Sequence, residues 1–126
     1  MADRIRVLLC DDVGMLRELL RYELEEHDDV VVVGEADNGL DGVRLVRELR
    51  PDVVVLDLAM PGIDGLEALS LMRAAPKPPA VLVHSGFDAE TMRDRVLALG
   101  ASEYVEKGGN LRDVRDAVLR VMGRQP

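Results

Sequence analysis

The chain has 126 residues, which suits one domain with a single core and is too short for two. Its composition, 48% hydrophobic and 32% charged, is ordinary for a soluble globular protein, and the net charge of −8 argues against nucleic-acid binding by this segment itself. The sequence has no secretion signal, no apolar run near the roughly 18 residues of a membrane span, and a single cysteine, Cys10. We therefore expect one cytoplasmic domain over residues 1–126, with its core between about 4 and 122 and no contact with a membrane.

Five short aliphatic runs alternate with segments of helical spacing along the chain. The runs cover residues 7–10, 30–33, 53–56, 80–83 and, more weakly, 104–105, and unbroken β-branched runs of this length are typical of strands buried on both faces. Apolar residues at helical spacing occupy 16–24, 40–49, 66–72, 92–99 and 111–121. This order predicts an α/β fold, a doubly wound parallel sheet with right-handed crossovers and helices on both faces.

The residues directly after the predicted strands are chemically distinctive. In an open parallel sheet, ligands bind beyond the carboxyl ends of the strands, near the point where the strand order reverses. The second strand ends in residues 34–36, which offer little chemistry and would lie away from that point in a sheet of order 2-1-3-4-5. The other four strands are followed by reactive side chains, namely Asp11 and Asp12, Asp57, Ser85, and Lys107.

These five side chains form a minimal set for phosphoryl chemistry. Carboxylates at ~4 Å repel by about 4 kcal/mol per pair at an effective dielectric near 20, so a cluster of three takes up protons or binds a hard cation such as Mg²⁺ (or Mn²⁺). A carboxylate can also be the nucleophile that accepts a phosphoryl group. The oxygens of that group then need a metal ion, a lysine and a hydroxyl donor around them.

Each of these residues also has an ordinary structural interpretation. Asp12 is suited to capping the first predicted helix, and Asp57 to capping the loop before the third. Ser85, before Gly86, is a common loop element, and Lys107 is a typical solvated surface charge. The joint placement of all of them at one edge of the sheet favours the functional interpretation.

Residues 57–65, Asp-Leu-Ala-Met-Pro-Gly-Ile-Asp-Gly, resemble the D-L-x-M-P-x-x-D-G signature of response-regulator receiver domains of bacterial two-component systems. The resemblance covers about residues 4–122, and its other blocks are the acidic pair at 11–12 and the segments 85–86, 100–101 and 104–107. It implies a flavodoxin-like (βα)₅ three-layer fold with the strand order 2-1-3-4-5. It also implies a phosphorylation-dependent signalling switch.

The resemblance assigns the roles in phosphorylation residue by residue. Asp57 would accept a phosphoryl group from a histidine kinase in a Mg²⁺-dependent reaction. Asp12 would be the main metal-binding acid, assisted by Asp11, by Asp57 itself and by the backbone carbonyl of Ala59.

It also assigns the residues that would respond to the new phosphate. Lys107 would pair with the acyl phosphate, while Ser85 would bind a phosphoryl oxygen and move inward. Tyr104 occupies the position of the family's switch aromatic, although an ordinary strand-face tyrosine fits the sequence equally well.

The implied partners are a sensor histidine kinase and, after phosphorylation, a second copy of the chain or a downstream effector. The domain would not be an enzyme beyond assisting its own phosphorylation and dephosphorylation. Two alternatives stay open for the output. The chain is either a stand-alone receiver or the front of a transcription regulator with a helix-turn-helix output that binds DNA.

Four positions bear on how closely the chain follows the family pattern. Gly108 follows Lys107 where many receivers have a cis proline, so the last loop is expected to be less stiff. Glu103 stands where glycine is frequent. Ala59 and Phe87 occupy positions that tune dephosphorylation in the family, and neither offers a group to orient the attacking water, which predicts a phosphoryl lifetime set largely by partner proteins.

The histidines and the cysteine are interpreted as structural. His84, directly before Ser85, could face the core or the edge of the site, and the structural role is favoured. His27 is interpreted as a surface or capping residue, and Cys10 as a buried thiol in an apolar run.

Three rival functions fit the sequence less well. A haloacid-dehalogenase-type phosphatase also uses a strand-end aspartate, but it needs a second acid two residues on, where Ala59 stands. A flavodoxin-like FMN carrier needs a phosphate cradle in the first loop, where Asp11 and Asp12 would repel phosphate. A phosphate-independent pseudo-receiver normally lacks one or more of the five groups, and none is missing here.

Overall fold

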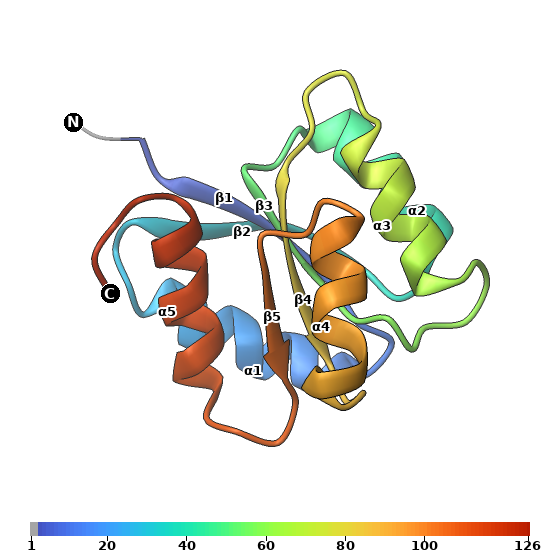
Figure 1. Ribbon diagram of the computed structural model, residues 1–126. Helices are drawn as coiled ribbons and strands as arrows, with labels where there is room; N and C mark the ends of the chain where they lie inside the picture. The colour runs from blue at the N-terminus through green and yellow to red at the C-terminus, as the bar shows by residue number, and fades with distance from the viewer. Residues whose placement is uncertain (1–2) are drawn as a thin grey trace.

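The computed structural model of the chain describes residues 3–126 and consists of five parallel strands that alternate with five helices (Figure 1). The sheet has the order β2-β1-β3-β4-β5, which confirms the predicted doubly wound topology. The elements in chain order are β1 (Ile5–Cys10), α1 (Gly14–Glu25), β2 (Val30–Ala36), α2 (Gly39–Leu49), β3 (Val53–Leu56), α3 (Gly65–Arg73), β4 (Ala80–Ser85), α4 (Ala89–Ala98), β5 (Glu103–Glu106) and α5 (Leu111–Val121).

Two apolar clusters, one on each face of the sheet, hold the three layers together. Along β1, Leu8 and Cys10 belong to the cluster covered by α2, α3 and α4, whereas Val7 and Leu9 belong to the cluster covered by α1 and α5 (Figure 1). Burial on both faces explains why the strands appear in the sequence as unbroken apolar runs. Each fully buried aliphatic side chain contributes about 1.5–3 kcal/mol, so this core fixes the strand ends that carry the polar residues.

Most strands are longer than the aliphatic runs predicted. β2 continues through Glu35 to Ala36, and β4 continues through His84 to Ser85. These residues stay in the ladder because backbone hydrogen bonds to the neighbouring strand do not depend on side-chain polarity. Ser85 is therefore the last residue of β4 and not the first residue of the loop.

Four of the five helices begin with a side-chain cap. Asn38, Asp64, Asp88 and Asn110 each accept a hydrogen bond from a backbone N–H in the first turn of α2, α3, α4 and α5 respectively. Helix α1 follows Val13 and has no side-chain cap, so the structural alternative of Asp12 as a helix cap does not apply. Among residues 3–126, no helix is both long and apolar enough to cross a membrane.

Two glycines shape the loops around the carboxyl edge of the sheet. A Cβ at Gly65 would lie 2.4 Å from the Leu58 carbonyl oxygen, so only glycine allows α3 to pack this closely on the loop after β3. Gly108 has φ +103°, a conformation that proline cannot adopt. The glycine after Lys107 is thus required by the path of this last loop.

Candidate functional site at the carboxyl edge of the sheet

The parallel register brings the predicted residues together at one edge of the sheet. Cys10 pairs with Leu56 in the ladder, and the Asp57 N–H donates to the Cys10 carbonyl at 2.9 Å. On the other side, the Lys107 N–H donates to the Ser85 carbonyl at 2.8 Å. Asp11, Asp57 and Ser85 are all buried at this edge, with at most 3% of each residue exposed.

Lys107 binds two of the three carboxylates. Its Nζ lies 2.8 Å from Oδ2 of Asp11 and 3.1 Å from Oδ2 of Asp57. Partial burial lowers the pKa of the Lys107 ammonium, but the hydrogen bonds to both carboxylates outweigh burial and raise the pKa above its ordinary value. The lysine is therefore charged at neutral pH and offsets part of the repulsion between Asp11 and Asp57.

Backbone amides bind the other oxygens of the two buried carboxylates. The Val13 N–H donates to Oδ1 of Asp11 at 2.9 Å, and the Ala59 N–H donates to Oδ1 of Asp57 at 3.1 Å. These bonds fix the orientation of both side chains. The two carboxylates are thus held in a defined geometry.

Asp12 is exposed and completes an acidic cluster with Asp11 and Asp57. One carboxylate oxygen from each residue lies within 4.8 Å of the others. Three negative charges against the single positive charge of Lys107 leave an excess that a hard divalent cation can neutralise. The all-oxygen donor set suits Mg²⁺, which takes one or two carboxylates and retains several waters.

The hydroxyl groups of Ser85 and Tyr104 both bind the backbone of Phe87, in the loop between β4 and α4. The Ser85 side chain is fully buried, and its Oγ accepts from the Phe87 N–H at 3.5 Å. Tyr104 is buried too, and its hydroxyl donates to the Phe87 carbonyl. Burial raises the pKa of the Tyr104 hydroxyl, so it stays protonated and serves as this donor. The tyrosine therefore connects β5 to the loop between β4 and α4.

Two buried groups near the site are not part of it. Burial, together with the charge of Asp11, raises the pKa of the Cys10 thiol to about 12, so the thiol stays protonated and unreactive. His84 is buried and its Nδ1 has no hydrogen-bond partner among residues 3–126. Burial lowers the pKa of His84, and the charge of Lys107 lowers it further, against the opposing effect of Asp11 and Asp57.

The structure also gives roles to residues that the sequence did not single out or explain. The Glu106 carboxylate accepts from the Ala89 N–H at 3.0 Å and so binds the first turn of α4. Glu103, at a position where glycine is frequent, forms a two-point ion pair with Arg120 of α5 at 2.6 and 3.0 Å. His27 accepts from the Asp29 N–H at 3.2 Å, a contact within the turn between α1 and β2.

One further contact escaped the sequence pattern. Arg17 of α1 donates to the Asp11 backbone carbonyl at 2.6 Å and also pairs with Glu35 of β2 at 2.9 Å. Its only sequence signal is its place one turn into the helix that follows the acidic pair, and that is too weak to identify it.

Comparison with known proteins agrees with this geometry. Residues 7–119 match the response regulator receiver domain family. This chain is a receiver domain of that family. The Bacillus subtilis transcriptional regulatory protein LiaR is 38% identical over 122 residues, 97% of this chain and 58% of that protein. The Bordetella pertussis virulence regulator BvgA is 39% identical over 117 residues, 93% of this chain and 56% of that protein.

Solved structures agree as well. The signal receiver domain of the response regulator NarL from Mycobacterium tuberculosis superposes with a TM-score of 0.90 at 32% identity, covering 97% of this chain and 98% of that one. The receiver therefore has the flavodoxin-like fold and is a phosphorylation-dependent switch module of the two-component type. Family members interact with histidine kinases, bind Mg²⁺ at an acidic pocket and are for the most part not enzymes. This receiver spans rather more than half the length of the regulators it matches.

Proposed function

We propose that Asp57 is the phosphoacceptor of this receiver, in a Mg²⁺-dependent (or Mn²⁺-dependent) reaction with a histidine kinase. The observation that carries the proposal is the arrangement of Asp57 itself. Its carboxylate is almost fully buried, is bound at Oδ2 by Lys107 and at Oδ1 by the Ala59 amide, and faces two further aspartates. An aspartate with a purely structural role would not require a lysine and two further carboxylates around it.

The chemistry follows from these contacts. An Asp57 oxygen attacks the phosphorus of a phosphohistidine, so an O–P bond forms, the N–P bond breaks, and the imidazole leaves and takes up a proton from solvent. Asp11, Asp12, Asp57 and the Ala59 carbonyl would hold the cation, which would supply positive charge beside the transferred group. Lys107 pairs with an oxygen of that group, and Ser85 donates its hydroxyl to another.

The output follows from the contacts between β5 and α4. When Ser85 moves toward the phosphoryl group, its bond with the Phe87 amide is lost, and the hydrogen bond from Tyr104 to the Phe87 carbonyl changes with it. These are the contacts that hold the loop before α4, so a local change in charge alters the α4–β5 surface. We propose that this surface then changes its affinity for a second copy of the receiver or for an effector.

The regulators LiaR and BvgA support a further part of the proposal. Their names describe transcription regulation, and this receiver matches rather more than half of each. We propose that it regulates transcription in the cytoplasm through a DNA-binding output outside residues 1–126, while the receiver itself makes no nucleic-acid contact.

The test is incubation with Mg²⁺ and acetyl phosphate, followed by intact-mass measurement. We expect a gain of one phosphoryl group, which is absent in Asp57→Asn and in the presence of EDTA. Asp64→Asn is the matched control, because Asp64 lies in the same loop but only caps α3, a role that asparagine fills equally well. Full modification of Asp57→Asn, or loss of modification in Asp64→Asn alone, would refute the assignment.

A further inference from the structure

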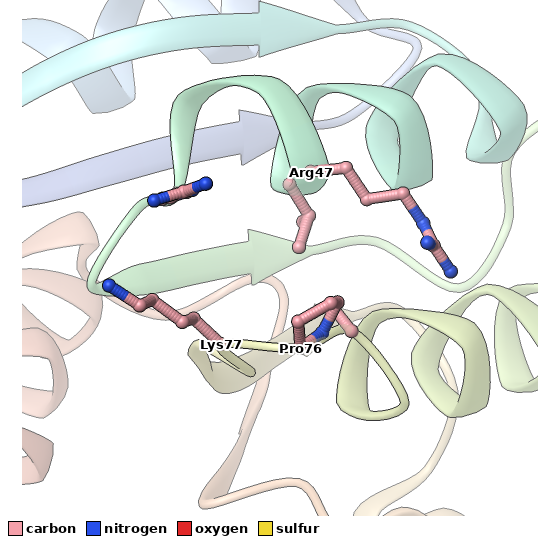
Figure 2. A pocket seen from close by; sticks show the side chains of 6 residues that line it. Arg47, Pro76 and Lys77 are labelled. Atoms are coloured by element: carbon pink, nitrogen blue, oxygen red, sulfur yellow. The ribbon is translucent and has the colours of Figure 1, made fainter.

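A small cavity lies at the end of the sheet opposite Asp57, between the last turn of α2 and the loop that leads from α3 to β4 (Figure 2). Its volume is about 170 Å³, and it is lined by Val46, Arg47, Arg50, Ala75, Pro76 and Lys77. Three of these residues are cationic and none is acidic, although the chain has 24 acidic and only 16 basic residues. The cavity is thus a local positive site on a strongly negative protein.

The cations around the cavity are not neutralised by the protein. None of Arg47, Arg50 and Lys77 forms an ion pair with any carboxylate of residues 3–126. Arg44, on the same helix, instead pairs with Asp41 and Glu48. Because like charges around one cavity repel one another, an anion that enters it gains favourable interactions and relieves this repulsion.

The backbone of Arg50 supports a role for its side chain. With φ 50° and ψ 59°, it is the one non-glycine residue in the left-handed region among residues 3–126. It ends α2 at the position where glycine is favoured, so the turn itself does not explain an arginine. The Arg50 carbonyl accepts from the Arg6 guanidinium at 2.8 Å, and this contact offsets the negative end of the helix dipole beside the cavity.

Lys77 is presented by a rigid segment. Pro76 precedes it and Pro78 and Pro79 follow it, so proline rings fix the backbone on both sides. A ligand that binds Lys77 therefore orders only the lysine side chain, and the backbone contributes little further entropy loss. The loop is preorganised for binding.

The arrangement of the side chains indicates the shape of the ligand. In Figure 2 the Arg47 and Lys77 side chains extend in opposite directions, with Pro76 between them. Val46 and Ala75, which are both buried, also line the cavity and give it an apolar part beside the cationic residues. We propose that this cavity binds a small organic molecule with two anionic groups, either carboxylates or phosphates, joined by a carbon stem.

The experiment is an NMR titration of the ¹⁵N-labelled receiver with acetate, inorganic phosphate, succinate, glutarate, propane-1,3-diol bisphosphate and neutral succinamide. We expect succinate, glutarate or the bisphosphate to bind roughly tenfold or more tightly than acetate, and succinamide to cause no shifts. The shifting amides should be those of residues 46–50, 75 and 77, and not those near Asp57 and Lys107. The tighter of the dicarboxylate and the bisphosphate identifies the charged group of the ligand.

Matched variants separate this site from general charge attraction. Arg47→Gln and Lys77→Gln should each weaken binding by about fivefold or more, while Arg44→Gln, which removes one charge from the same helix, should change it by less than about twofold. Arg50→Gly should weaken binding and yet raise Tm, because glycine relaxes the turn. Equal binding of all the anions, or equal effects of Arg44→Gln and Arg47→Gln, would overturn the proposal.

Discussion

The Lys107 ammonium lies 3.1 Å from Oδ2 of Asp57, although 50 residues separate the two in the chain. The same ammonium lies 2.8 Å from Asp11, so one cation binds two carboxylates that are each almost fully buried. Without the lysine, two like charges would face each other in a region of low dielectric. The contact between Lys107 and Asp57, the proposed phosphoacceptor, thus also stabilises the fold.

Replacement of this lysine should therefore cost stability. In the absence of divalent cations, we expect Lys107→Gln to lower the free energy of unfolding by about 1–3 kcal/mol, measured by urea denaturation. The loss should be about 1 kcal/mol smaller in an Asp57→Asn background, because one of the two carboxylates is then neutral. Lys77→Gln, at the chain's only other lysine, is the control and should lie within about 0.5 kcal/mol of the natural sequence. Equal losses in the two backgrounds would contradict the shared ion pair.

The sequence predicted that Asp57 and Lys107 lie close together, because their proximity follows from the topology of the parallel sheet. Each residue comes directly after a strand of the sheet, and parallel strands end at one edge of a sheet. The sequence did not predict that Asp11 is buried beside the lysine while Asp12 is exposed. That choice depends on how the loop leaves β1, where the Val13 amide binds Asp11, and no periodic pattern encodes it.

The contacts of Glu103 and Glu106 were unpredictable for a related reason. Both residues lie on β5 and bind groups of a helix. Glu103 binds Arg120 of α5, and Glu106 binds the Ala89 amide of α4. Such pairs depend on side-chain directions across elements that are distant in sequence. Hydrophobic periodicity locates the elements but not these partners.

The hydrogen bond between Tyr104 and the Phe87 carbonyl gives a second prediction. Tyr104→Phe removes only the donor, so we expect a loss of about 0.5–1.5 kcal/mol in stability and faster amide hydrogen exchange in the loop of residues 86–89. Tyr22→Phe is the matched control, because Tyr22 is 72% exposed and should change neither quantity. Unchanged exchange in Tyr104→Phe would show that the tyrosine does not hold this loop.

The lifetime of the phosphoryl group gives a third prediction. Ala59 and Phe87 flank the site and are both exposed, and neither side chain can orient a water molecule for attack on the acyl phosphate. We expect the isolated receiver to lose its phosphoryl group slowly, and Ala59→Asn or Phe87→Glu to change the decay rate measured by intact mass. Leu97→Glu, at an exposed residue on α4 away from the site, is a control that should leave the rate unchanged. If neither Ala59→Asn nor Phe87→Glu alters the decay, these positions do not tune it.

His84 makes stability depend on pH in a defined direction. Burial, and then the charge of Lys107, lowers its folded pKa below the ordinary value of 6.5, so the folded state disfavours its protonation. The contribution of His84 to stability is therefore fully present above pH 6.5 and is lost as the pH falls from there toward the folded pKa, with a slope of at most about 1.4 kcal/mol per pH unit. In urea denaturation between pH 8 and pH 5, the free energy of unfolding should fall less in His84→Leu than in the natural chain. His27→Gln, at the other histidine, should show the same acid-induced loss of unfolding free energy as the natural chain. If the unfolding free energies of His84→Leu and the natural chain fall in parallel with pH, His84 is not the source of this loss.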